Sequence, residues 1–217
     1  MGPSTRSKAP ITYQILCYLV TNCNFGSMCA LNKALLTFGF FGALRGSEYT
    51  ATASGSGTIS APRLNSVQFL SVESKLSYIF TISKSKTSSK PIQVYVGCSG
   101  TEVCAVCALK DYLAYRSLNI GLHPESYLFC DSQGRPIHKD YLNKLIKQGI
   151  LALDLDSGLY SSHSLRSGAA TTASQLGFND ADLKALGHWR STAYLTYIHN
   201  SQQHRFNYSA RLASQPL

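Results

Sequence analysis

The apolar segment at residues 28–44 constrains the fold of this chain more than any other stretch. Its large side chains are leucines and phenylalanines, at Leu31, Leu35, Leu36, Phe38, Phe40 and Phe41. The segment is long enough to form a helix that is buried in a protein core. Glycines toward its end permit close backbone approach and a tight exit, at Gly39, Gly42 and Gly46. We therefore predict a buried core helix that ends in a sharp turn.

Arg45 and Glu48 lie at this exit, three residues apart. A core helix that delivers such a pair often presents a functional site. An ion pair on the surface at a helix end gives the same pattern and is just as common. The pair by itself therefore leaves both interpretations open.

Three runs in the middle of the chain have strand character, at residues 67–70, 75–83 and 92–96. The last two alternate apolar and polar residues, which is typical of half-buried strands. The tip that joins these two runs carries three lysines, Lys84, Lys86 and Lys90. A basic tip is usually a solvated turn, but it can also reach a phosphate group.

Helical patterns and one loop account for most of the remaining chain. Residues 49–62 are rich in threonine, serine, glycine and alanine, and we expect a surface loop there. Further helices are expected at residues 9–22, 101–118, 138–151, 165–176 and 179–186, with a last one beginning near Ser191 or Thr192. The sequence therefore predicts one α+β domain, mostly helical, with a small antiparallel three-stranded sheet.

The chain is basic along its whole length. Its 217 residues carry a net charge of +9, from 20 Lys+Arg against 11 Asp+Glu. This favours a polyanionic partner, with nucleic acid ahead of an anionic membrane surface, although a basic protein without such a partner has the same composition. No run of 18 or more apolar residues occurs, so the sequence predicts no membrane span.

The seven cysteines are an odd number, and no secretory signal precedes them. We therefore interpret them as reduced thiols of an intracellular protein. Cys104 and Cys107 form a CxxC pair, with Cys98 shortly before it and Cys130 further on. A zinc site needs four ligands at convincing spacing, and the second pair is missing. Since the pair also begins a helical pattern in which small buried residues are expected, we predict no bound metal.

Reactive side chains gather near the C-terminal end of the chain, within residues 161–199. They are His163, Arg166, His188, Tyr194 and Tyr197. If the chain performs chemistry, we expect it here.

Three motifs resemble the signature of the tyrosine recombinases, the phage-integrase family. One motif of this chain resembles the second box of that signature: His163-x-x-Arg166, then Leu186-Gly187-His188, then Tyr197 nine residues after His188. The first box of the signature resembles Leu44-Arg45-Gly46-Ser47-Glu48, and the catalytic β-hairpin lysine of the family corresponds to Ser85-Lys86-Thr87. The resemblance covers residues 9–200. Within the family, residues 38–49, 163–172 and 193–198 look most like recombinases of the DIRS, Ngaro and Crypton mobile elements.

The chemistry of these residue types agrees with the resemblance. A tyrosine phenol, with a pKa near 10, is a poor nucleophile at neutral pH. Attack on a phosphodiester builds charge on the non-bridging oxygens, and two arginines can clamp these bidentately. Arg45 and Arg166 are the natural pair for this clamp. His163 can activate the tyrosine or donate a hydrogen bond, and His188 can hydrogen-bond another non-bridging oxygen.

Tyr197 would be the covalent nucleophile. Tyr194 is the alternative, but the spacing from His188 selects Tyr197. Lys86 would protonate the leaving 5′ oxygen, and Glu48 would orient Arg45 or His163. The predicted DNA contacts are Lys84, Lys90, Lys139 and Arg190.

The resemblance implies a site-specific DNA recombinase that stores bond energy in a 3′-phosphotyrosyl link and needs neither metal nor nucleotide. It implies double-stranded DNA as substrate, a synaptic tetramer on DNA, and integration or excision of a mobile element, in the nucleus for a eukaryotic element. We interpret residues 1–8 as a linker or a remnant of expression and residues 9–200 as the catalytic domain. The polar residues 201–217 would be a tail able to dock on a neighbouring protomer.

Two alternatives stay open. A type IB topoisomerase uses related chemistry on one duplex, but residues 194–197 lack the Ser-Lys-x-x-Tyr character of that family. A domesticated, non-catalytic DNA-binding domain has no need of a complete set of catalytic residues.

Overall fold

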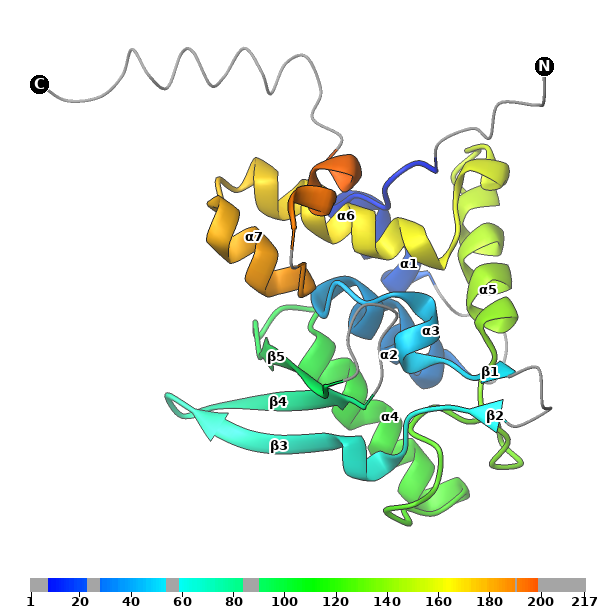
Figure 1. Cartoon of the computed structure of the whole chain (residues 1–217). Helices are drawn as coiled ribbons and strands as arrows, with labels where there is room; N and C mark the ends of the chain where they lie inside the picture. The colour runs from blue at the N-terminus through cyan, green and yellow to red at the C-terminus, as the bar shows by residue number, and fades with distance from the viewer. Residues whose placement is uncertain (1–7, 23–27, 54–58, 84–89, 190, 199–217) are drawn as a thin grey trace, which may run out of the picture.

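The chain folds into a helical body with a small sheet along its side (Figure 1). Our computed structural model describes residues 8–22, 28–53, 59–83, 90–189 and 191–198. The α-helices are α1 (Tyr13–Thr21), α2 (Cys29–Phe41), α3 (Gly46–Tyr49), α4 (Ala105–Asn119), α5 (Lys139–Leu151), α6 (Ser162–Gln175) and α7 (Asp180–Gly187). The 3₁₀ helices are η1 (Leu64–Ser66), η2 (Ser157–Leu159) and η3 (Thr192–Tyr197). Of the helices described, none is both long and apolar enough to cross a membrane.

The sheet consists of β3 (Val67–Val72), β4 (Lys75–Ile82) and β5 (Ile92–Gly97), antiparallel in that order. In the central strand Tyr78 is paired with Phe69 on one side and Val96 on the other. Because side chains alternate along a strand, Tyr78, Phe80 and Ile82 are all buried on one face. The predicted three-stranded antiparallel sheet is confirmed.

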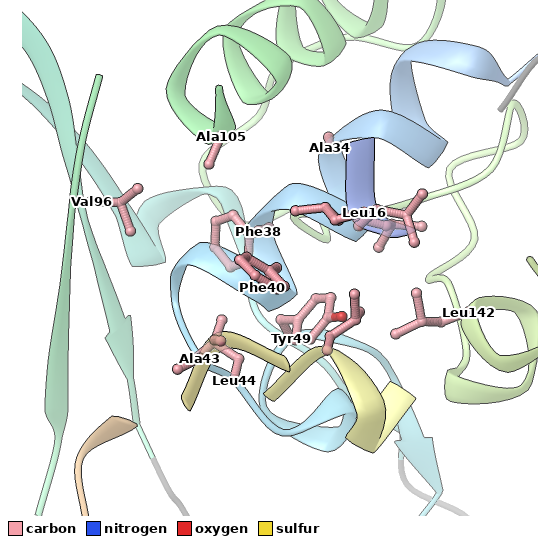
Figure 2. Close-up of a cluster of buried hydrophobic side chains, with 14 of the residues drawn as sticks. Leu16, Ala34, Phe38, Phe40, Ala43, Leu44, Tyr49, Val96, Ala105 and Leu142 are labelled. Atoms are coloured by element: carbon pink, nitrogen blue, oxygen red, sulfur yellow. The ribbon is translucent and has the colours of Figure 1, made fainter. Parts of the chain in front are cut away.

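Helix α2 forms the centre of the core, as its apolar sequence predicts. The ring of Phe38 packs against those of Tyr49, Tyr78, Phe80 and Phe129, with centroid separations of 4.9 to 5.8 Å. Figure 2 shows Phe38 lying between Val96 of β5 on one side and Leu16 of α1 on the other. The helix therefore joins the sheet to the helical body.

The exit of α2 is the predicted sharp turn, and it fixes the start of α3. Ala43 adopts a left-handed backbone with φ 45°, and the N–H of Leu44 donates back to the Gly39 carbonyl at 2.9 Å. A Cβ atom on Gly39 would lie 2.2 Å from the Tyr49 hydroxyl oxygen. Only glycine therefore lets α3 pack this closely on α2, which holds Arg45 at the edge of the core.

The structure differs from the sequence prediction at several element boundaries. A short ladder, β1 (Thr52–Ala53) with β2 (Ile59–Ser60), forms within the stretch predicted as a loop. Helix α4 begins at Ala105 rather than residue 101, after a turn in which Gly100 has φ 68°. Helix α6 begins three residues before the predicted Leu165, because Ser161 and Ser164 form a reciprocal capping box. The last helix begins at Thr192 after the cap Ser191, as predicted, and it is a 3₁₀ helix.

Replacing Gly168 by alanine is expected to destabilise the fold by about 3 kcal/mol or more. Gly168 lies within α6, where helix propensity alone favours alanine by about 1 kcal/mol. The added Cβ would, however, lie 1.8 Å from the carbonyl oxygen of Ile11, a backbone atom held by the bond from the Ile11 N–H to the Ser164 carbonyl. Urea unfolding measures the change. Gly97→Ala is the control, because its Cβ would meet only Ser77 Oγ, at 3.9 Å, and similar stabilities for the two variants would contradict the prediction.

Candidate active site

Arg166 is the centre of the candidate site. It lies in the second turn of α6 and is 1% exposed. Its guanidinium donates to two backbone carbonyls, that of Ala43 after α2 and that of Gly187 at the end of α7, the latter at 2.7 Å. One buried side chain therefore holds three separate segments together, and it brings the exit of α2 to the site.

Arg45 reaches the same site from the start of α3. Its side chain is 24% exposed, and its Nη1 forms an ion pair with Glu48 Oε1 at 2.8 Å. The other oxygen of Glu48 accepts from the Arg45 backbone N–H at 2.8 Å. Glu48, which is 8% exposed, therefore fixes both the backbone and the side chain of Arg45.

His188 and Trp189 follow α7 and close the site from another side. His188 is the left-handed C-cap of α7, with φ 54°. The Trp189 ring lies under the Arg166 guanidinium, 4.4 Å from its carbon to the ring centroid, which is cation–π geometry. A Cβ on Gly187 would meet this ring at 2.0 Å, so glycine is needed for the tryptophan to fold back. The Trp189 side chain therefore packs against the arginine.

Tyr197 ends η3, which lies against α6 (orange in Figure 1). Its ring packs edge-on against His163 with centroids 5.0 Å apart, and it lies 5.8 Å from the Trp189 ring. The Arg166 guanidinium carbon is 6.0 Å from the Tyr197 ring centroid. The Thr171 hydroxyl of α6 donates to the Tyr197 carbonyl at 2.9 Å and anchors this residue.

Tyr194 lies only one 3₁₀ turn earlier, but its hydroxyl is engaged elsewhere. It is 4% exposed, and it donates a hydrogen bond to Asp180 Oδ1 in the first turn of α7. Asp180 in turn forms an ion pair with Lys184 at 2.5 Å. The two tyrosines that the sequence offered as alternatives therefore have different surroundings, and Tyr197 is the one beside His163 and Arg166.

Comparison with known proteins decides the family. The model of the phage integrase family matches residues 63–204, well over half of the chain. The chain belongs to the phage integrase family. Arg45 and Glu48 lie before the matched residues, and tertiary contacts bring them to the rest of the site. A search of curated proteins gives no match.

Solved structures of tyrosine recombinases share the fold of this family member. A XerH site-specific recombinase bound to a palindromic difH substrate aligns with a TM-score of 0.66 at 19% identity, covering 97% of this chain and 55% of that one. XerA recombinase aligns with a TM-score of 0.63 at 14% identity, covering 99% of this chain and 67% of the XerA chain. The Tn1549 transposon integrase in complex with transposon right-end DNA aligns with a TM-score of 0.60 at 18% identity, covering 99% of this chain and 69% of the integrase chain. The chain thus spans about half the length of the XerH chain, and the predicted tyrosine-recombinase catalytic-domain fold is confirmed.

Burial and the two arginines set the protonation of the site of this integrase-family chain. Burial, followed by the charges of Arg166, Arg45 and Lys139, lowers the pKa of His163 below 6.5. Burial and Arg166 lower the pKa of His188 in the same way. Burial and Arg45 also lower the pKa of Arg166, to about 10, which leaves it cationic at neutral pH. The site therefore combines two arginine cations with two neutral imidazoles.

Several buried nitrogen atoms of the site have no hydrogen-bond partner in the described part of the chain. They are Nε of Arg166, Nε2 of His188 and Nε1 of Trp189. Leaving a buried polar atom unsatisfied costs about 1–3 kcal/mol, so such atoms are rare unless a ligand meets them. An anion with several acceptor oxygens would satisfy donors of this kind.

The predicted site residues are not all within the described structure. Arg45, His163, Arg166, His188 and Tyr197 come together, as described above. Lys84, Lys86 and Arg190 lie outside the described residues. Lys139, the first residue of α5, is exposed and close enough to act on His163, whereas Lys90 lies at the base of the β4–β5 tip. Reasoning from sequence missed Thr171 and Asp180, because hydroxyl and carboxylate side chains that support a neighbouring segment carry no motif.

Lowering the pH below about 6.5 is expected to destabilise the fold through His163 and His188. Since their pKa values are lowered in the folded state, the unfolded chain binds protons first as the pH falls. The contribution of each histidine to the free energy of unfolding is complete above its pKa in the unfolded chain, and it is lost as the pH falls through its pKa in the folded chain. The loss is at most about 1.4 kcal/mol per pH unit for each histidine. Urea unfolding at about pH 7.5 and about pH 5.5 measures this loss. The double variant His163→Gln, His188→Gln should reduce it, and exposed His123→Gln should not; an unchanged loss in the double variant would refute the assignment.

Proposed function

We propose that this chain is the catalytic domain of a site-specific DNA recombinase, which cleaves and rejoins strands through a 3′-phosphotyrosyl intermediate on Tyr197. The observation that carries the proposal is the grouping of one phenol with two guanidinium groups and two neutral imidazoles around unpartnered nitrogen donors. No single member of this group is unusual. Their convergence from α3, α6, α7 and η3 suits one phosphodiester.

The two arginines would hold the phosphate. Arg166 directs two of its nitrogens to backbone carbonyls, which leaves Nε as the donor aimed at a ligand. Arg45 is more open and is oriented by Glu48. Charge that develops on the non-bridging oxygens would be stabilised by these fixed donors, with His188 Nε2 as a further partner. Mutagenesis of comparable donors in other enzymes lowers the rate about 100- to 1,000-fold.

His163 would take the proton from Tyr197. Its lowered pKa keeps the imidazole neutral, and only a neutral imidazole can accept a proton. The attack forms an O–P bond from the phenol to the 3′ phosphate and breaks the bond to the 5′ oxygen. The 5′ oxygen leaves with a proton, which we assign to Lys86, and the reverse steps rejoin the strand.

DNA would be bound across the open side of the site. The net charge of +9 supports a phosphate-rich partner, and exposed Lys139 lies beside His163. The further contacts that we propose are Lys84, Lys90 and Arg190. The structural relatives named above include complexes with DNA, which agrees with this assignment.

Strand exchange would require a tetramer on two DNA sites, with residues 201–217 docked on a neighbouring protomer. An apolar groove between α1, the end of α2 and α6 supports such docking. Its rim carries two exposed apolar side chains, Leu176 at 72% and Phe178 at 45%. The DNA that is integrated or excised would be a mobile element of the DIRS, Ngaro or Crypton kind, and the recombinase would act in the nucleus.

A nicked suicide DNA substrate tests the proposal. The wild-type chain, incubated with such DNA in the presence of a metal chelator and without nucleotide, should form a covalent protein–DNA band. Digestion and mass spectrometry should place the nucleotide on the peptide that contains Tyr197. DNA binding without a covalent band would instead support a non-catalytic DNA-binding domain, and relaxation of supercoiled DNA without recombination between two sites would support a topoisomerase.

A further inference from the structure

Three cysteines that the proposed recombinase chemistry does not use converge at the junction of β5 and α4. Cys98 follows β5 directly, Cys104 is the N-cap of α4, and Cys107 lies in its first turn. Their sulfur atoms all lie within 4.8 Å of one another. The turn at Gly100, with φ 68°, is what brings Cys98 back to the CxxC pair.

The sulfur separations match a metal site better than a disulfide. Cys98 Sγ lies 3.8 Å from Cys107 Sγ and 3.6 Å from Cys104 Sγ. A Zn–S bond of about 2.3 Å gives a tetrahedral S···S edge of about 3.8 Å. A disulfide requires about 2.05 Å. Thiols in simple contact lie at a similar separation, and metal titration distinguishes contact from coordination.

The start of α4 places two of the three thiols where a metal ion can be held. Cys104 and Cys107 lie at the N-terminus of a 15-residue helix, whose dipole stabilises negative charge. The first turn of this helix holds no acidic residue, so no carboxylate competes for that place. Cys104 is buried while Cys107 is exposed, which gives an ion an inner anchor and an entry path.

We propose that Cys98, Cys104 and Cys107 bind one zinc ion, with a solvent molecule in the fourth position. Binding forms three Zn–S bonds and releases three thiol protons to the solvent. Among the described residues, no other histidine, cysteine or carboxylate joins this group, and Cys130 lies apart beside Tyr112. From the sequence we named these three cysteines but predicted no metal, because we required a second CxxC pair. The third ligand lies six residues before the first pair, across a turn.

The ion would cross-link the end of β5 to the start of α4. These two elements contact each other and the core, and β5 continues from the β4–β5 tip that carries Lys86. Zinc would therefore stabilise the sheet side of the domain without taking part in the proposed strand cleavage. This role is independent of the proposed function.

Cobalt titration tests the site. The chain is reduced, stripped of metal, and titrated with Co²⁺ under anaerobic conditions, with a thiol assay to confirm reduction. We expect thiolate-to-cobalt charge-transfer absorption that saturates at one equivalent and is displaced by Zn²⁺. Zn²⁺ should also raise the unfolding temperature, because a ligand that binds only the folded state stabilises it.

Cys98→Ala and Cys107→Ala should each weaken binding by roughly a hundred-fold or more, because loss of a group that merely orients a ligand already costs about 10- to 100-fold. Neither side chain is buried, so circular dichroism should show a retained fold. Cys29→Ala, a half-buried cysteine at the start of α2, is the matched control and should bind like the wild type. Absence of the absorption with fully reduced thiols, or its persistence in the double variant Cys98→Ala, Cys107→Ala, would overturn the proposal.

Discussion

The variant Tyr197→Phe is expected to form no covalent adduct with nicked DNA, a loss of roughly ten thousand-fold or more, comparable to removal of a nucleophile in other covalent enzymes. The substitution removes one oxygen atom and keeps the ring. The contacts of that ring with His163 and Trp189, at 5.0 and 5.8 Å, should persist, so the fold and DNA binding should change little. Adduct formation is measured on denaturing gels, and DNA binding in parallel by mobility shift.

Tyr194→Phe is the matched control for this variant. It makes the same chemical change three residues earlier, and it removes a hydrogen bond to Asp180 rather than a group beside the arginines. We expect a loss of about 1 kcal/mol in stability and a retained covalent band. If the band instead vanishes in Tyr194→Phe and survives in Tyr197→Phe, the assignment of the nucleophile is wrong.

The second large effect is expected for Arg166→Lys. Lysine keeps the positive charge but cannot reproduce the fork that spans the Ala43 and Gly187 carbonyls and still carries Nε as a further donor without a partner among the described residues. Adduct formation should fall by about 100- to 1,000-fold, as for the loss of a fixed donor to a developing oxyanion. Stability should fall by about 2 kcal/mol or more, since hydrogen bonds of a charged group are lost.

The chain contains a matched control for this substitution, Arg116. It is also 1% exposed, and it also donates to backbone carbonyls, including those of Leu128 at 3.0 Å and Gly121 at 3.1 Å, but it lies in the last turn of α4, away from the site. Arg116→Lys should lose similar stability and keep adduct formation when assayed well below its unfolding temperature. Equal loss of adduct in both variants would mean that Arg166 acts only through the fold.

Much of the secondary structure could be predicted because its signals are local. The apolar run of α2, the alternation in β4 and the Asn179 cap of α7 each lie within a few residues of the element that they specify. The predicted element boundaries were wrong where the local structure depends on two separate residues or segments. The β1–β2 ladder joins residues on either side of a loop, and the start of α6 depends on a capping box formed by two serines, which is a weaker signal than an apolar stripe.

The candidate site shows the same division. The resemblance to the family signature was enough to predict Arg45, His163, Arg166, His188 and Tyr197 as a set, and the structure brings them together. The role of Trp189 as a platform under Arg166 could not be derived, because a cation–π contact depends on how α7 returns to α6. The convergence of Cys98 with the CxxC pair could not be derived for a similar reason, since the turn at Gly100 decides which thiols meet.

The sequence by itself was enough to predict the family, the α+β class and the core helix, because patterns of burial and motif spacing are local features of the chain. Spacing along the chain selected Tyr197 over Tyr194, but only the tertiary structure shows the reason in space, since the Tyr194 hydroxyl is held by Asp180 while the Tyr197 ring lies beside His163 and Arg166. It also decided the protonation of the histidines, because burial and the approach of two arginines from distant segments set their pKa values. Arg166 contacts Ala43, which lies more than a hundred residues earlier in the chain. A local sequence pattern cannot predict such a contact, because it depends on how distant segments pack together.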